Sequence, residues 1–187
     1  LASRLCNDLG PEIGSGLVDC SLVGGNWDNA TLFAKQFSNS PLNYLQFVNV
    51  DSTHQAYGKG ANPITAGGIS TNPVNLAGSI IFLSGDHAGL NVPANSNFSL
   101  DLVEGFASRN AYVLGSTGYV YVGPDILWTE RLIRIYEEEI TRGFSATIGD
   151  ALVEAKRRYY LENNSRNAYD SKVVQQTVLY GLPMYAI

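Results

Sequence analysis

The segment that most constrains the fold is an uncharged apolar run at residues 79–83, which stops abruptly at small and polar residues. It consists of Ser, Ile, Ile, Phe and Leu, and the chain continues with Ser-Gly-Asp-His-Ala-Gly-Leu. Because no polar residue alternates with the apolar ones, the run predicts a strand that is buried on both faces of a sheet. In open α/β sheets, ligands bind just beyond the carboxyl ends of such strands. We therefore expect a site at residues 85–89, around Asp86 and His87.

Length and composition bound the class of protein. The chain has 187 residues, of which 45% are hydrophobic and 16% are charged, so we expect a single globular domain over residues 1–187. The net charge of −5 argues against a nucleic acid as the main partner. No apolar run approaches the roughly 20 residues that span a bilayer, so we expect no membrane partner. The first residue is Leu rather than Met, which favours a processed or trimmed chain.

Cysteine and histidine usage predicts no metal site. No cofactor is expected either, because the glycines at 24–25 and at 115–118 lack the pattern of a nucleotide-binding loop. The two cysteines, Cys6 and Cys20, lack the spacing of metal ligands, and the chain has only two histidines. Two buried or free thiols are favoured over one disulfide, although the sequence leaves both open. These counts fix no cellular compartment.

Hydrophobic periodicity predicts strands that alternate with helices. Strands are predicted at residues 17–23, 44–50, 79–83 and 111–114, with a last strand pair at 173–180 and 182–187. Amphipathic helices are predicted at residues 27–37, 98–107, 127–142 and 147–161, the last of them opened by Thr147. Residues 55–75 show no periodicity and predict a long surface loop. The alternation implies a layered α/β fold with a mostly parallel sheet.

Four motifs carry a resemblance to a known family. They read LSGDHAGL at residues 83–90, AYVLGSTG at 111–118, IGDALVEAK at 148–156 and VLYGLP at 178–183. Together with a strand that leads to His54, they resemble the caspase-like (clan CD) cysteine peptidases, above all the gingipain family and the related CHAT-domain peptidases. The resemblance covers the chain from residue 17 onward.

The resemblance implies a fold, a substrate class and a location. The fold would be an α/β caspase-like three-layer sandwich with a mostly parallel central sheet and with further strands upstream. The chain is then expected to lack those upstream strands, and an upstream fragment of the same precursor becomes a candidate partner. The substrate would be a peptide or protein, and the location favoured by the resemblance is extracellular or periplasmic, in bacteria.

The family's catalytic residues fall on two positions of this chain. A catalytic His follows one central strand in these peptidases and corresponds to His54, and the nucleophilic Cys follows the next strand and corresponds to Asp86, after Gly85. The backbone N–H groups of Gly85, Asp86 and His87 are candidates for an oxyanion hole. By the same resemblance, the candidate substrate-binding residues are His87, Ser116, Thr117, Tyr119, Asp125 and Trp128.

The chain departs from the family pattern at both catalytic positions. Asp86 stands where the family has Cys, and Gln55 follows His54 where the family has Gly. A thiolate is a strong nucleophile near neutral pH, whereas a carboxylate attacks an amide poorly and any anhydride collapses back. We therefore expect a cysteine-type endopeptidase domain that is inactive in this form, its nucleophile removed naturally or by engineering. If the two side chains approach each other, we expect a fixed His54–Asp86 ion pair.

Other interpretations remain open from the sequence. One is a natural pseudopeptidase that binds a peptide or a partner protein without cleavage. Another is an unrelated doubly wound domain that binds a small anion at its strand ends, which a His54–Asp86 separation beyond about 10 Å would favour. Asp86 can also be a plain turn or cap residue, His54 a loop histidine satisfied by its neighbours, and His87 a structural residue.

Overall fold

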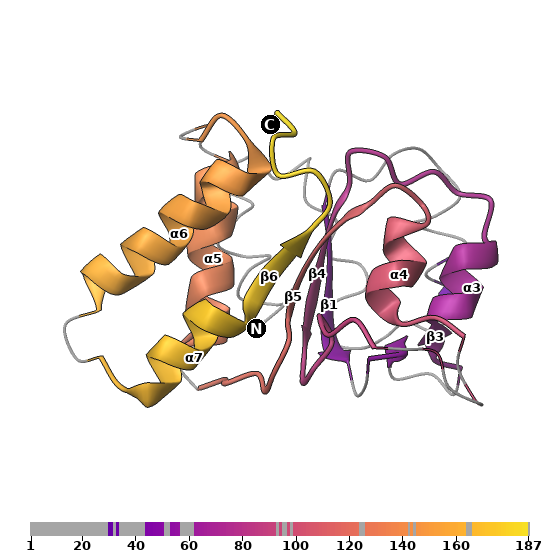
Figure 1. Ribbon diagram of the computed structural model, residues 1–187, viewed down its shortest axis with the longest axis horizontal. Coiled ribbons are helices and arrows are strands. Elements are labelled where there is room, and N and C mark those ends of the chain that lie inside the picture. The colour runs from indigo at the N-terminus through magenta and orange to yellow at the C-terminus, as the bar shows by residue number, and fades with distance from the viewer. Residues whose placement is uncertain are drawn as a thin grey trace.

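A computed structural model describes residues 30–31, 33, 44–50, 53–56, 62–92, 94, 97, 99–123, 126–141, 143, 145–163 and 166–186. Over these residues the protein is mixed α/β, with five helices, a four-stranded sheet and a two-stranded sheet (Figure 1). Cys6, Cys20, Asp125 and the strand predicted at 17–23 lie outside the described residues, as does most of the helix predicted at 27–37.

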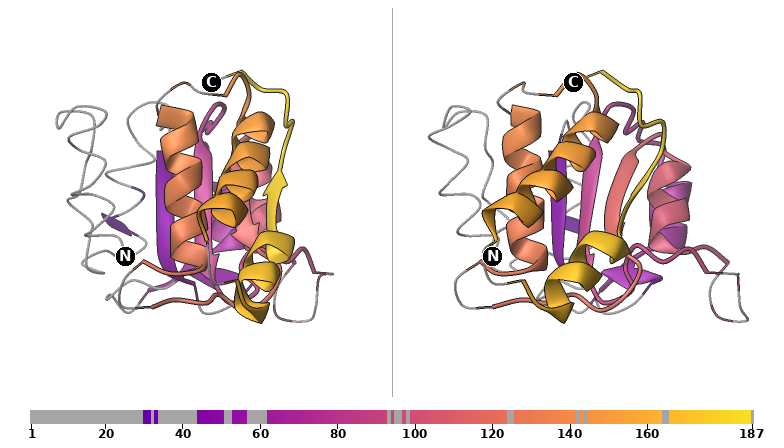
Figure 2. Two further views of the ribbon diagram at one scale, coloured as in Figure 1. Left: turned by 90° about the vertical axis from the view of Figure 1, so that its left-hand side faces the viewer. Right: turned by 60° about the vertical axis from the view of Figure 1, so that its left-hand side comes forward.

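The four-stranded sheet has the order β1–β4–β5–β6 (Figure 2). Its strands are β1 (Tyr44–Val50), β4 (Ile80–Gly85), β5 (Tyr112–Ser116) and β6 (Thr177–Tyr180). The first three strands run parallel, and β6 runs antiparallel to β5. Tyr44 pairs with Ile80 and Val50 pairs with Gly85, so β1 and β4 end together at one edge of the sheet.

Both faces of β4 are covered, as its unbroken apolar run predicts. On one face, Ile81 and Leu83 pack in the core formed with α3 (Ala66–Thr71) and α4 (Leu102–Ala107). On the other face, Ile80 and Phe82 pack with α5 (Thr129–Thr141) and α6 (Ile148–Glu162), which lie on the opposite side of the sheet (Figure 1). Alternate side chains of one strand therefore contribute to two separate apolar cores.

Local capping fixes where two of these helices begin. Thr147 caps α6, as predicted, because its Oγ1 accepts the Asp150 N–H at 3.1 Å. The predicted helix at 98–107 is shorter than expected, because Asp101 and Glu104 form a capping box. Asp101 Oδ1 accepts the Glu104 N–H at 2.8 Å, and this cap keeps Asp101 in an extended conformation with φ −91° and ψ 173°. The helix α4 therefore starts at Leu102.

The strand pair predicted at 173–180 and 182–187 is wrong in two respects. Residues 168–176 form the helix α7 (Ala168–Gln176), and only Thr177–Tyr180 form a strand. Asn167 and Asp170 make a capping box that starts this helix, and Val173 is buried as a core-facing helical residue. Among the described residues 182–186 no strand forms beside β6, and Ala186 makes an isolated antiparallel bridge with Thr147.

The loop predicted at 55–75 contains regular structure. β2 (Gln55–Ala56) and β3 (Ile64–Thr65) pair antiparallel, and α3 follows β3 directly. Thr65 ends β3 and caps α3, because its Oγ1 accepts the Gly68 N–H at 3.0 Å. Ile64 and Ile69 are fully buried, so single well-placed apolar residues fix a segment that lacks a repeating pattern.

We expect Tyr136→Phe to reduce the loss of stability at alkaline pH. Tyr136 of α5 is fully buried against Phe82, and burial raises the pKa of its phenol above the ordinary value of 10.0. A folded-state pKa above the unfolded value means that this stability is fully present below pH 10 and is lost as the pH rises further. Above pH 10, Tyr136 should lower the free energy of unfolding by about 1.4 kcal/mol per pH unit, and the variant should lack this contribution.

Urea unfolding from about pH 8 to about pH 11 measures the effect of Tyr136→Phe. The variant should also lose about 1 kcal/mol below pH 10, because Tyr136 Oη donates to Ile148 O at 3.2 Å. Burial, and to a lesser extent the hydrogen bond to Asp170, also raises the pKa of Tyr159. The free energy of unfolding of the variant should therefore still fall somewhat at alkaline pH. Equal slopes in the two proteins would contradict the prediction.

Candidate functional site

The two predicted catalytic positions lie beyond the ends of neighbouring parallel strands. β1 ends at Val50 and β4 ends at Gly85, and these two residues are partners in the sheet. Asp86 follows β4 directly, and His54 comes four positions after the end of β1. His54 is buried, with 8% of its surface exposed, whereas Asp86 is exposed. Strand order and register therefore bring the chain to both residues at the same edge of the sheet.

His54 is held by backbone groups of two neighbouring segments. Its Nδ1 donates to Leu100 O at 2.9 Å, and its own carbonyl accepts the Ala66 N–H at 3.1 Å. The carbonyl of Thr53 accepts the Leu102 N–H at 2.7 Å. Because a carbonyl oxygen can only accept, Nδ1 must carry a proton, and Nε2 is then the basic nitrogen of the neutral ring. A backbone carbonyl thus sets the tautomer that a general acid or base needs.

Asp86 ties the end of β4 to the segment that follows β5. Its Oδ1 accepts the Val120 N–H at 2.8 Å. In the same turn, the His87 N–H donates to Gly118 O at 2.8 Å. His87 has a φ of 58°, in the left-handed region that costs energy for a residue with a side chain. A strained residue therefore lies directly beside the position predicted for the nucleophile.

These contacts bear on two expectations from the sequence. The oxyanion role of the His87 N–H is wrong for this conformation, because that group already donates to Gly118 O. His54 Nδ1 bonds to Leu100 O, and Asp86 Oδ1 accepts the Val120 N–H. Asp86 thus joins the turn after β4 to the segment after β5.

Two of the candidate substrate-binding residues, His87 and Tyr119, are brought together. Their rings meet edge to face with centroids 4.8 Å apart, and Tyr119 is 60% exposed. Trp128 lies elsewhere, with its ring centroid 5.6 Å from that of Tyr169 in α7. Thr117 also faces α7 and donates its N–H to the carbonyl of the last helical residue at 2.9 Å. The exposed ring of Tyr119 offers an apolar face with a polar tip, which suits contact with a peptide.

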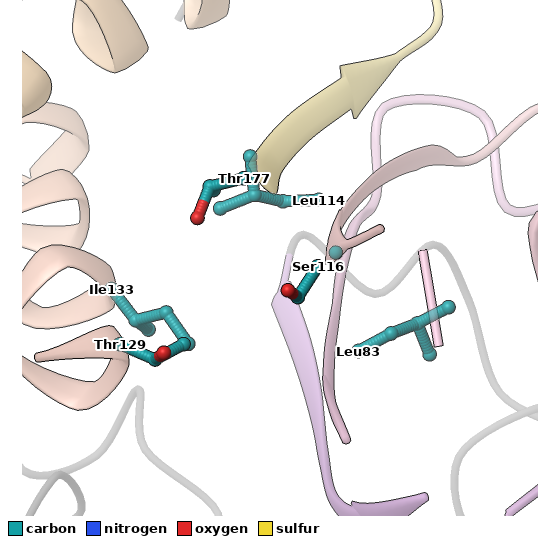
Figure 3. Close-up of a pocket in the computed structure, with 7 residues that line it drawn as sticks. Leu83, Leu114, Ser116, Thr129, Ile133 and Thr177 are labelled. Carbon is teal, nitrogen blue, oxygen red and sulfur yellow. The ribbon is translucent and has the colours of Figure 1, made fainter. Parts of the chain in front are cut away.

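Ser116 lies in a small pocket between the ends of the central strands and α5 (Figure 3). The residues that line it are Leu83, Leu114, Gly115, Ser116, Thr129, Ile133 and Thr177. The hydroxyl groups of Ser116, Thr129 and Thr177 all have hydrogen bonds to the backbone. About 10 Å³ is left for a water-sized molecule, which is room for about one water. The pocket is therefore too small for a substrate side chain.

Two residues of the candidate site, Leu100 and Asp101, are marked neither by hydrophobic periodicity nor by the four motifs. The spacing Asp101-x-x-Glu104 is a capping-box signature that predicts the capping role of Asp101. The contact between Leu100 O and His54 uses a backbone atom, so no side-chain pattern encodes it. Among the residues that the structure describes, no group of three or more His, Cys, Asp or Glu side chains could hold a metal ion.

Within the described ranges, no helix combines the length and the apolar character needed to cross a membrane. No protein-family model, curated protein or solved structure matches this chain. Any proposal for its function therefore depends on the motifs and on the geometry at the strand ends.

Proposed function

We propose that the chain is a gingipain-like cysteine-endopeptidase domain in which Asp86 occupies the nucleophile position, and that it binds a peptide or protein segment without cleaving it. Its fold would be the caspase-like three-layer sandwich with a mostly parallel sheet. The observation that carries the proposal is the pairing of Val50 with Gly85, because it brings the strands before His54 and Asp86 to a common edge. Chemistry at the carboxyl ends of adjacent parallel strands is the general rule for such sheets.

The state of His54 supports an acid–base role. The Nδ1–H bond to Leu100 O fixes the tautomer in which Nε2 is the basic nitrogen, which is the tautomer that a His/Cys dyad requires. Asp86 removes the other half of that dyad, because its carboxylate is a poor nucleophile toward an amide. The result would be a domain that retains a peptide-binding edge but forms no acyl-enzyme.

The charge of Asp86 argues against a domain that binds a small anion at its strand ends. An exposed carboxylate at the end of the central strand repels an anion at the position where such a domain would hold it. The exposed ring of Tyr119 beside His87 favours a ligand with apolar side chains instead.

Asp86→Cys tests the proposal by restoring the missing thiol. With a library of internally quenched peptides, the variant should hydrolyse some members at least about tenfold faster than Asp86→Ala. The alanine variant is the matched control, since it keeps Cys6, Cys20 and His54. Adding His54→Ala to the cysteine variant should return hydrolysis to the control rate. A folded Asp86→Cys protein that cleaves no peptide would count against the endopeptidase ancestry.

A further inference from the structure

Asp101 makes more contacts than a helix cap requires. Its side chain is fully buried at the N-terminus of α4. Oδ1 accepts the Glu104 N–H at 2.8 Å, which completes the cap. Oδ2 accepts the Val92 N–H at 2.8 Å, and Val92 lies on the segment that leaves the turn at Asp86. The second oxygen therefore joins α4 to the chain that follows the nucleophile position.

The residues on either side of Asp101 hold the loop that carries His54. Leu100 O accepts from His54 Nδ1 at 2.9 Å, and the Leu102 N–H donates to Thr53 O at 2.7 Å. Three consecutive residues thus contact both halves of the candidate site, the histidine loop through the backbone and the segment after Asp86 through the buried carboxylate.

The segment between Asp86 and Val92 is short and internally bonded. The Ala88 N–H donates to Gly85 O at 3.2 Å, and the Leu90 N–H donates to His87 O at 2.9 Å. Tyr180 Oη also donates to Gly89 O at 2.6 Å, which fixes the middle of the segment to β6. A contact at Val92 is therefore transmitted to the position of Asp86 through a compact turn.

We propose that Asp101 is a positioning residue that sets the distance and orientation between His54 and the side chain at position 86. The inference rests on the proposed function, because it assumes that positions 54 and 86 correspond to the His/Cys dyad of the family and act as a dyad once a thiol is restored at position 86. Its physical basis is that reacting groups must be held closely, since a misplacement of about 1 Å can cost about 100-fold in rate. Capping of α4 requires only Oδ1 of Asp101, so the bond from Oδ2 to the Val92 N–H is additional to the cap.

The test measures how fast iodoacetamide alkylates the thiol of Asp86→Cys as a function of pH, with the modified peptide followed by mass spectrometry. This readout needs no substrate and separates position 86 from Cys6 and Cys20. A neighbouring imidazolium favours the thiolate, so the variant should react faster in mildly acidic solution than the same protein with His54→Ala. Replacing His87 by Asn, which tolerates a positive φ, controls for the other imidazole.

Asp101→Ser in the Asp86→Cys protein is the informative combination. Serine caps a helix well but offers one oxygen where aspartate offers two, so the cap on α4 stays and the bond to Val92 is lost. We expect the alkylation rate in mildly acidic solution to fall by about tenfold, to that of the His54→Ala protein. Thr147→Ala, which removes the cap of the distant helix α6, should leave the alkylation profile unchanged. Asp101→Asn is the second variant if the serine protein does not fold.

The outcomes separate the two proposals. If His54→Ala does not alter the alkylation profile of Asp86→Cys, the dyad is absent and the proposed function fails together with the inference. If His54→Ala alters the profile but Asp101→Ser and Asp101→Asn do not, the proposed function stands and Asp101 is only a cap.

Discussion

Gly89→Ala is expected to destabilise the fold by at least about 3 kcal/mol, and so to remove a large part of its total stability. A Cβ added to Gly89 would lie 2.4 Å from the carbonyl carbon of Gly115 and 2.7 Å from its Cα. Both are backbone atoms of β5, which cannot move aside because it is paired with β4 on one side and β6 on the other. The close approach also holds the turn, since the Gly89 N–H donates to Ser116 O at 2.9 Å.

Urea unfolding of Gly89→Ala measures this loss, with Gly67→Ala as the matched control. A Cβ on Gly67 would meet nothing within 4 Å, and Gly67 lies in α3, where alanine is the better helix former. We expect Gly67→Ala to be neutral or to gain up to about 1 kcal/mol. Similar midpoints for both variants would show that the Gly89–Gly115 contact does not limit stability.

The part of the fold that the sequence predicts best has strong periodicity or unbroken burial. β1 matches the predicted range 44–50, and β4 and β5 lie within two residues of theirs at their ends. The helices α5 and α6 also match closely, because their apolar residues recur at helical spacing and Thr147 marks the start of α6. These elements are encoded locally, so the pattern of one segment is enough to predict each of them.

The elements that the sequence patterns miss depend on single residues or on distant partners. The apolar residues of 173–180 favour a strand, but the Asn167–Asp170 capping box commits residues 168–176 to helix. The sequence patterns single out His54 and Asp86 as candidates but do not reveal the contacts that hold them. The bond from His54 to Leu100 spans 46 residues, and the bond from Asp86 to Val120 spans 34. Leu100 and Val120 form these bonds with backbone atoms, so their residue types do not reveal the contacts.

The second large effect concerns Arg158 of α6, which pairs with Glu138 and Glu139 of α5 and with Glu162 of its own helix. Nη1 donates to Glu139 at 2.6 Å, Nη2 to Glu138 at 3.0 Å and Nε to Glu162 at 3.2 Å. Burial lowers the pKa of the guanidinium, but the hydrogen bonds to these carboxylates more than offset this and raise it. Arg158→Met would leave the nearly buried carboxylates of Glu138 and Glu139 without this cation. We expect a loss of about 3 kcal/mol, at the lower end for breaking a buried pair, because the Arg158 side chain is 25% exposed.

Arg157→Met is the control for this prediction, because Arg157 is the neighbouring arginine on α6 but points into solvent. Its side chain is 61% exposed and pairs with Glu154 at 2.7 Å, so its removal should cost less than about 1 kcal/mol. Chemical unfolding of the two variants side by side measures the difference, and equal losses would contradict the prediction. A double-mutant cycle with Glu139→Gln isolates the pair between Arg158 and Glu139. The double variant should be more stable than the two single losses predict, since the glutamine leaves no buried charge at position 139.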